Sequence, residues 1–99
     1  MTIIKFNNTT FEVTSFNKST YFNGNLVSAA TCELEGTNVD ALEPFLTTPI
    51  TTLQIYYNDA LIYDLQNITA RIDAINEVLE VNHMGISVNI TFNPILDNE

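Results

Sequence analysis

The residues best suited to chemistry are Cys32, His83, Glu33 and Glu35. A cysteine and a histidine that meet in space can form a nucleophile and its base, but such a thiol needs a polar, electropositive setting. Cys32 lies in the middle of an alternating apolar run, which predicts a small buried side chain instead. The two glutamates share one face of the same run, where an acid–base pair or half a cation site is one interpretation. No third ligand lies near them in sequence, so a solvated face is the favoured one.

Other catalytic and cofactor-binding patterns are absent from the sequence. His83 stands in a turn, without the further histidines and cysteines that a zinc site requires. The chain has only 3 glycines, too few for a phosphate-binding loop or a dinucleotide fingerprint, and it has no Gly-x-Ser-x-Gly motif. We therefore expect a protein that is not an enzyme and that needs no metal or other cofactor.

The charge balance bears on possible partners. Twelve carboxylates oppose 3 cations, which gives a net charge of −9. Phosphate backbones and anionic membranes attract clusters of lysine and arginine, whereas Lys5, Lys18 and Arg71 are scattered. We expect neither nucleic-acid binding nor membrane docking. Asparagine and threonine replace most of the missing charge, so a sheet in this protein lacks the lysines that commonly protect strand edges from pairing. Protein partners or internal closure of the sheet are the expected consequence.

The start of the sequence and its single cysteine indicate where the protein resides. The opening residues MTIIKF are too short for the apolar core of a secretory signal, and no run approaches the length of a membrane span. Cys32 has no second cysteine with which to form an intrachain disulfide. We expect no signal peptide, and hence a protein that stays in the cytoplasm.

The central stretch of the chain, residues 51–64, predicts a β-hairpin. Two apolar, aromatic-rich runs flank the pair Asn58 and Asp59, and both residue types tolerate the positive φ angles of a tight turn. A second hairpin is predicted at the N-terminus around Asn7 and Asn8. Residues 26–35 and 86–92 alternate apolar and polar side chains, as strands with one buried face do. Residues 17–25 are expected to form a loop with Gly24 at its bend.

Two other segments bear on the topology. Residues 38–48 predict one short helix, capped near Asn38, with Pro44 in its first turn and Leu42, Phe45 and Leu46 on one side. Residues 68–81 fit either a helix or a strand with one bulge near residues 74–75. The β-branched residues and the immediate return into the strand at 86–92 favour a strand.

These elements predict a single domain over residues 1–99 that is mainly β. The expected fold is an antiparallel β-sandwich or a partly closed barrel, a meander of about seven strands with one short helix. Asn93 and Pro94 are expected to end the last strand.

Four aromatic residues are the candidate contact residues: Tyr21, Phe22, Tyr56 and Tyr57. Exposed aromatic side chains are enriched at interfaces, although Tyr21 and Phe22 fit a lid on the core even better. Beside asparagine and aspartate, these aromatic rings also suit sugars. Two or more of them in one concave patch would favour a carbohydrate- or host-surface-binding module.

The sequence from residue 38 to 92 resembles small β proteins of bacteriophage particles. The resemblance lies in the Asn/Thr-rich texture of the runs NVDALEPFLTTPITTLQIYYNDALIYDL, NITARIDAINEV and GISVNITF. It implies a tail or capsid accessory component, located in the virion, present in many copies and without catalysis. The function expected from the sequence is thus that of a structural or interaction subunit of a larger assembly, whose partners are further copies or capsid and tail proteins. A carbohydrate-binding module is the alternative.

Overall fold

The computed structural model describes residues 1–22, 24, 26–80 and 85–97, which form mainly β structure. In chain order the elements are β1 (Thr2–Phe6), β2 (Thr9–Phe22), β3 (Leu26–Glu35), the 3₁₀ helix η1 (Val39–Leu42), α1 (Pro44–Thr47), β4 (Leu53–Tyr57), β5 (Ala60–Leu65), β6 (Ile68–Glu80) and β7 (Gly85–Asp97). The seven antiparallel strands confirm the predicted class, and they belong to one sheet that does not close.

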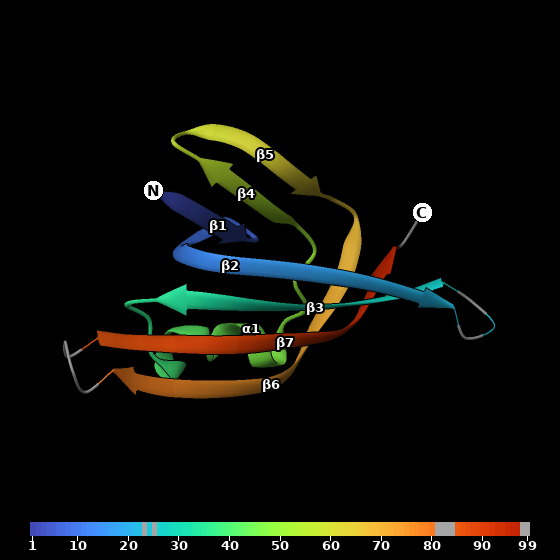
Figure 1. Ribbon diagram of the computed structural model, residues 1–99. Helices are drawn as coiled ribbons and strands as arrows, with labels where there is room; N and C mark the ends of the chain where they lie inside the picture. The colour runs from blue at the N-terminus through green and yellow to red at the C-terminus, as the bar shows by residue number, and fades with distance from the viewer. Residues whose placement is uncertain (23, 25, 81–84, 98–99) are drawn as a thin grey trace.

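The strand order differs from that of a consecutive meander. Along the sheet it is β5-β4-β1-β2-β3-β7-β6. Two hairpins meet at the centre, because β1 pairs with β4 on one side and with β2 on the other. Figure 1 shows β5, β4 and β1 on one side of a bend in the sheet and β3, β7 and β6 on the other. The strand β2 passes between the two halves, with a register irregularity between Val13 and Ser15. Such bulges increase the local bend of a strand.

The folded sheet encloses one apolar core. Phe6 is fully buried there, and its ring lies 5.4 to 5.7 Å, centroid to centroid, from three other phenylalanine rings. These rings come from β2, α1 and β7, and they are Phe11, Phe45 and Phe92. Tilted and edge-on aromatic pairs of this kind add to the free energy gained from burial alone. The core therefore joins both halves of the sheet to the helix.

The turns follow the sequence closely. Asn58 and Asp59 both have positive φ, and they connect β4 to β5 as a two-residue hairpin turn. Asn7 and Asn8 do the same between β1 and β2. The prediction of a strand for residues 68–81 is confirmed by β6, whose irregularities fall between Ala70 and Ala74.

Several predictions about boundaries were wrong. Residues 17–22 belong to β2, because they pair in continuous register with β3, and no loop begins before the end of that strand. Strand β7 continues through the cis Asn93–Pro94 peptide bond to Asp97. Leu26 has the same place in the alternation of residues 26–35 as Cys32, but it is exposed because it lies at the end of β3, beyond the core.

The helical segment is shorter than predicted and divided in two. The Asn38 side chain accepts a hydrogen bond from the Ala41 N–H, as an N-cap does, and Pro44 opens α1. Leu42 and Phe45 are buried, whereas Leu46 faces solvent, contrary to the prediction. The prediction that placed His83 in a turn lies outside the described residues.

The chain segment before β4 links the centre of the sheet to its β6 edge. On one side, the Asn7 Oδ1 accepts hydrogen bonds from the Thr51 N–H at 2.8 Å, the Thr51 hydroxyl at 3.0 Å and the Thr52 N–H at 3.1 Å. On the other side, the backbones of Ile50 and Ala70 exchange two hydrogen bonds. The segment therefore connects the β1–β2 turn with the beginning of β6.

We predict that Asn7→Gly lowers the free energy of unfolding by about 2 kcal/mol, because it removes the acceptor of three hydrogen bonds and the donor of a fourth, to the Pro49 carbonyl. The matched control is Asn8→Gly, since Asn8 also has positive φ but its side chain makes no hydrogen bond in the described structure. Glycine suits both backbone conformations, so only the lost side-chain bonds distinguish the variants. Urea unfolding of both variants measures the difference, and equal stabilities would contradict the role of Asn7.

Candidate functional site

The four predicted aromatic contacts lie at the ends of two different strands. Tyr21 and Phe22 end β2 and are 45% and 75% exposed, so they do not fold back as a lid on the core. Tyr56 and Tyr57 end β4. Figure 1 shows the ends of β2 and β4 on opposite sides of the view, so the four side chains do not form one patch.

The two tyrosines of β4 have different surroundings. The Tyr56 ring is partly buried, and the Lys5 Nζ lies 5.3 Å from its centroid, within the range of a cation–π contact. Its hydroxyl donates a hydrogen bond to the Gln54 Oε1 at 3.4 Å. Tyr57 is half exposed next to the β4–β5 turn. The Tyr56 side chain is therefore largely occupied by contacts within the sheet, whereas the Tyr57 side chain remains available for contact with a partner.

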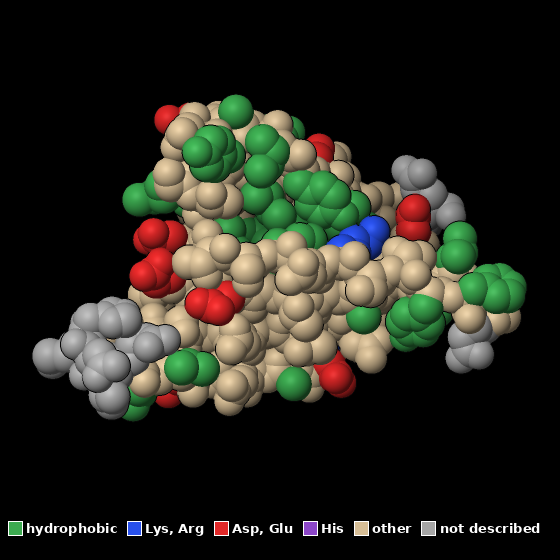
Figure 2. All heavy atoms as spheres, viewed as in Figure 1, with side chains coloured by type: hydrophobic (Ala, Val, Ile, Leu, Met, Phe, Trp, Pro, Cys, Tyr) green, Lys and Arg blue, Asp and Glu red, His purple; other side chains and the backbone are tan. Residues whose placement is uncertain are grey.

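A groove that the sequence did not predict lies between β2 and β5. It has a volume of about 420 Å³ and is lined by Phe16, Lys18 and Thr20 of β2 and by Tyr63 of β5. Figure 2 shows a hollow above β2 in which hydrophobic side chains gather, with a cationic side chain at its rim. We refer to these four residues as the β2–β5 groove.

The bend in β2 creates the groove. Strand β1 pairs with β2 only over residues 9–12, so the part of β2 beyond the bend has β3 on one side and no strand on the other among the described residues. Strand β5 then faces this part of β2 across the gap. The Phe16 and Tyr63 rings meet there, with centroids 5.7 Å apart, and form the apolar base of the groove.

The polar residues of the groove come from β2 alone. Phe16, Lys18 and Thr20 alternate along the strand and so point to the same face. The Thr20 hydroxyl is hydrogen-bonded to the Ser28 hydroxyl at 3.0 Å. Lys18 is exposed, and no carboxylate pairs with its ammonium group within the described ranges. The groove thus combines aromatic surface with a cation that has no counterion among the described residues.

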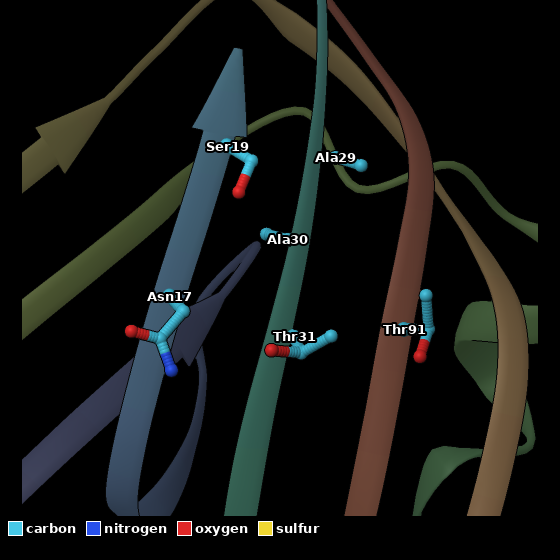
Figure 3. Close-up of a pocket in the computed structure, with 6 residues that line it drawn as sticks. All are labelled: Asn17, Ser19, Ala29, Ala30, Thr31 and Thr91. Atoms are coloured by element: carbon cyan, nitrogen blue, oxygen red, sulfur yellow. The ribbon is translucent and has the colours of Figure 1, made fainter. Parts of the chain in front are cut away.

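A second, shallower depression of about 110 Å³ lies across β2, β3 and β7. Figure 3 shows its side chains, which are small and carry no charge. Asn17 and Thr31 are cross-strand neighbours, and Thr31 in turn neighbours Thr91. This row offers hydroxyl and amide groups for hydrogen bonding, but no strong acid, base or nucleophile.

The chemistry-bearing residues of the sequence are not gathered at either depression. Cys32 is 2% exposed, and burial raises the pKa of its thiol to about 12. Glu33 neighbours Ser15 and Asn89 on the adjacent strands, and Glu35 neighbours Glu12 and Ser87. Among the described residues, no group of three or more histidine, cysteine, aspartate or glutamate side chains is placed to hold a metal ion.

Comparisons with known proteins give no assignment: no family model, no curated protein and no solved structure matches this chain. Over the residues that the structure describes, no helix has the length and apolar character needed to cross a membrane.

Sequence reasoning missed the groove because it assigned residues 17–25 to a loop. Within a continuous strand, the alternation of Phe16, Lys18 and Thr20 would have put these side chains on one face. Tyr63 was recognised only as part of a hairpin, and nothing in the sequence brings it next to Phe16.

We predict that Cys32 stays unmodified by a thiol-specific disulfide reagent in the folded protein up to about pH 10, because the thiolate is the reacting species. With its pKa raised from 9.0 to about 12, the folded thiol remains protonated over this range. The same reagent should modify Cys32 rapidly in concentrated urea, where the ordinary pKa returns. Rapid modification of the folded protein at pH 8 would contradict the burial of this thiol.

Proposed function

We propose that this protein is a non-enzymatic structural subunit of a larger assembly, which binds further copies or other proteins through the uncovered edges of its sheet. The observation that supports this most is the open sheet itself. Strands β5 and β6 end the strand order, and each pairs with a named strand on one side only in the described structure. The other side of β6 is bonded to Ile50 and Thr51 at its beginning, through Ile68 and Ala70. An open strand edge presents unpaired backbone donors and acceptors to another chain.

The β5 edge carries apolar side chains that suit a protein contact. Leu61 and Ile62 are 48% and 60% exposed. Leu61 pairs with Tyr56, and the preceding Ala60 pairs with Tyr57. The only charged residue of β5 is Asp64, which accepts hydrogen bonds from the side chains of Gln54 and Gln66. Large apolar side chains that lie exposed at a sheet edge are typical of interaction surfaces.

The β6 edge is protected over only half of its length. Its two register irregularities lie before Ala74, where they distort the edge and oppose pairing. From residue 74 to 80 the register with β7 is regular, and Leu79 in this part is 65% exposed. The strand contains no lysine, and its one cation, Arg71, belongs to the distorted half. Residues 74–80 are therefore the part of β6 best suited to pair with a neighbour.

The kind of assembly is proposed from the sequence. The resemblance of residues 38–92 to small bacteriophage particle proteins supports a tail or capsid accessory component, and hence a virion location. The neutral hydroxyl and amide groups on the outer face of β2, β3 and β7 are compatible with close packing of many acidic copies, because they add no charge there.

The carbohydrate-binding alternative gains no support from the residues that suggested it. Two or more of the four aromatic side chains would have to share one concave patch. The β2 pair and the β4 pair lie at opposite sides of the molecule (Figure 1), and within each pair successive strand residues point to opposite faces of the sheet. The neutral row on the outer face has hydroxyl groups but no aromatic ring among its lining residues.

We predict that the molar mass measured by light scattering rises with protein concentration. It should rise more steeply as salt is added, because salt screens the repulsion between copies that each carry a charge of −9. The variants Ile62→Lys and Leu79→Lys should each reduce this association, since a lysine at a strand edge opposes pairing.

The matched control for these variants is Leu46→Lys. Leu46 is 53% exposed, close to the two edge residues, but it belongs to α1 and not to an edge strand. The β6 residues beside it, Arg71 and Ile72, lie outside residues 74–80. Its substitution should leave the association unchanged. A strict monomer at every concentration and salt level, with no partner in its native particle or lysate, would refute the proposed function.

A further inference from the structure

We propose that the β2–β5 groove binds an extended segment of a different protein, which adds as a strand to the open edge of β2 and places a carboxylate on Lys18. This inference rests on the proposed role as an assembly subunit. It assigns a partner to the open edge of β2, which is separate from the edges of β5 and β6. Three observations support it.

The first observation is the unpaired edge of β2. Residues 15–22 pair with β3 on one side, and no described strand pairs with them on the other. Eight residues of extended chain span about 26 Å, at roughly 3.3 Å per residue, which is long enough for a stable strand contact. Since β1 is antiparallel to β2 and lies beside its first residues, a segment that continues the line of β1 would pair antiparallel with residues 15–22.

The second observation is the apolar base beside this edge. Phe16 and Tyr63 are each partly buried, and their rings meet at 5.7 Å. In recognition by strand addition, main-chain hydrogen bonds provide affinity, and pockets for alternate side chains provide specificity. The groove supplies such a pocket at the point where the open edge begins.

The third observation concerns charge. Lys18 is one of only 3 cations in the chain, and its ammonium group has no carboxylate partner within the described structure. Lys5 is already held over the Tyr56 ring, so Lys18 is the cation that the groove offers to a ligand. A partner segment with apolar side chains beside one aspartate or glutamate would suit both the apolar base of the groove and the Lys18 ammonium group. A second copy would bring a charge of −9 to the contact, which favours a different protein as the partner.

The test uses a synthetic fluorescent peptide in which valine and threonine alternate around a central glutamate. Fluorescence anisotropy measures its binding to the full chain, and amide hydrogen exchange locates it. We expect saturable binding and slower exchange over residues 15–22. Lys18→Glu should weaken binding at least about tenfold, because repulsion replaces a charge-assisted contact. A peptide with lysine at its centre should bind this variant better than the glutamate peptide does.

Two controls separate strand addition from simpler binding. Lys5→Glu makes the same change in net charge outside the groove and should leave the affinity nearly unchanged. A peptide with alternate backbone nitrogens methylated keeps its side chains but cannot complete the strand contact, so it should not bind.

Several results would overturn the inference. They are the absence of saturable binding at millimolar peptide, equal affinity of the methylated peptide, an unchanged affinity of Lys18→Glu, or exchange protection on β6 alone. Displacement of the peptide by a uronic-acid oligosaccharide would assign the groove to sugars instead. Self-association that Lys18→Glu abolishes would assign it to a second copy. Because association through β5 and β6 is measured with other variants, its failure is distinguishable from failure of the groove.

Discussion

The contact on which the structure depends most is the packing around Phe6. This ring touches one phenylalanine from β2, one from α1 and one from β7, and so it joins elements from both halves of the bent sheet. A single open sheet has only one face that it can bury. In this protein the sheet buries that face by folding over itself, and the aromatic cluster fills the space between the halves. The short helix completes the cover, because Leu42 and Phe45 are both buried.

The bend also determines what remains available for binding. Strand β1 pairs with only the first four of the 14 residues of β2, and the remainder of β2 has an open edge and the groove beside β5. The two outermost strands have no second neighbouring strand in the described structure, although the beginning of β6 is bonded to Ile50 and Thr51. The same bend in the sheet therefore accompanies both a tightly packed core and three open strand edges, on β2, β5 and β6. The thiol, which is the strongest nucleophile of the chain, lies inside that core, whereas the described surface presents hydroxyl and amide groups, apolar side chains and many carboxylates.

Local signals in the sequence predicted much of the fold. The pairs Asn7–Asn8 and Asn58–Asp59 each form a turn with positive φ, and the Asn38 cap begins the helical segment. The alternating pattern of β3 correctly predicts that Cys32 and Leu34 are buried. The strand order could not be obtained in this way, because pairing β1 with β4 and β3 with β7 depends on contacts between distant residues. The same reason explains the missed groove, since Phe16 and Tyr63 meet only after the sheet has folded. Polar residues in the last part of β2 looked like a loop because that part extends beyond the core and faces solvent.

The central claim is that the edges of this sheet are contact surfaces for protein partners. Amide-resolved NMR over a dilution series tests it most directly, because it identifies the residues that change environment as copies associate. We predict chemical-shift changes and line broadening that are confined to β5 and to residues 74–80 of β6. Both should disappear on dilution. Spectra that stay identical from the most dilute to the most concentrated sample, or changes confined to the α1 surface, would contradict it.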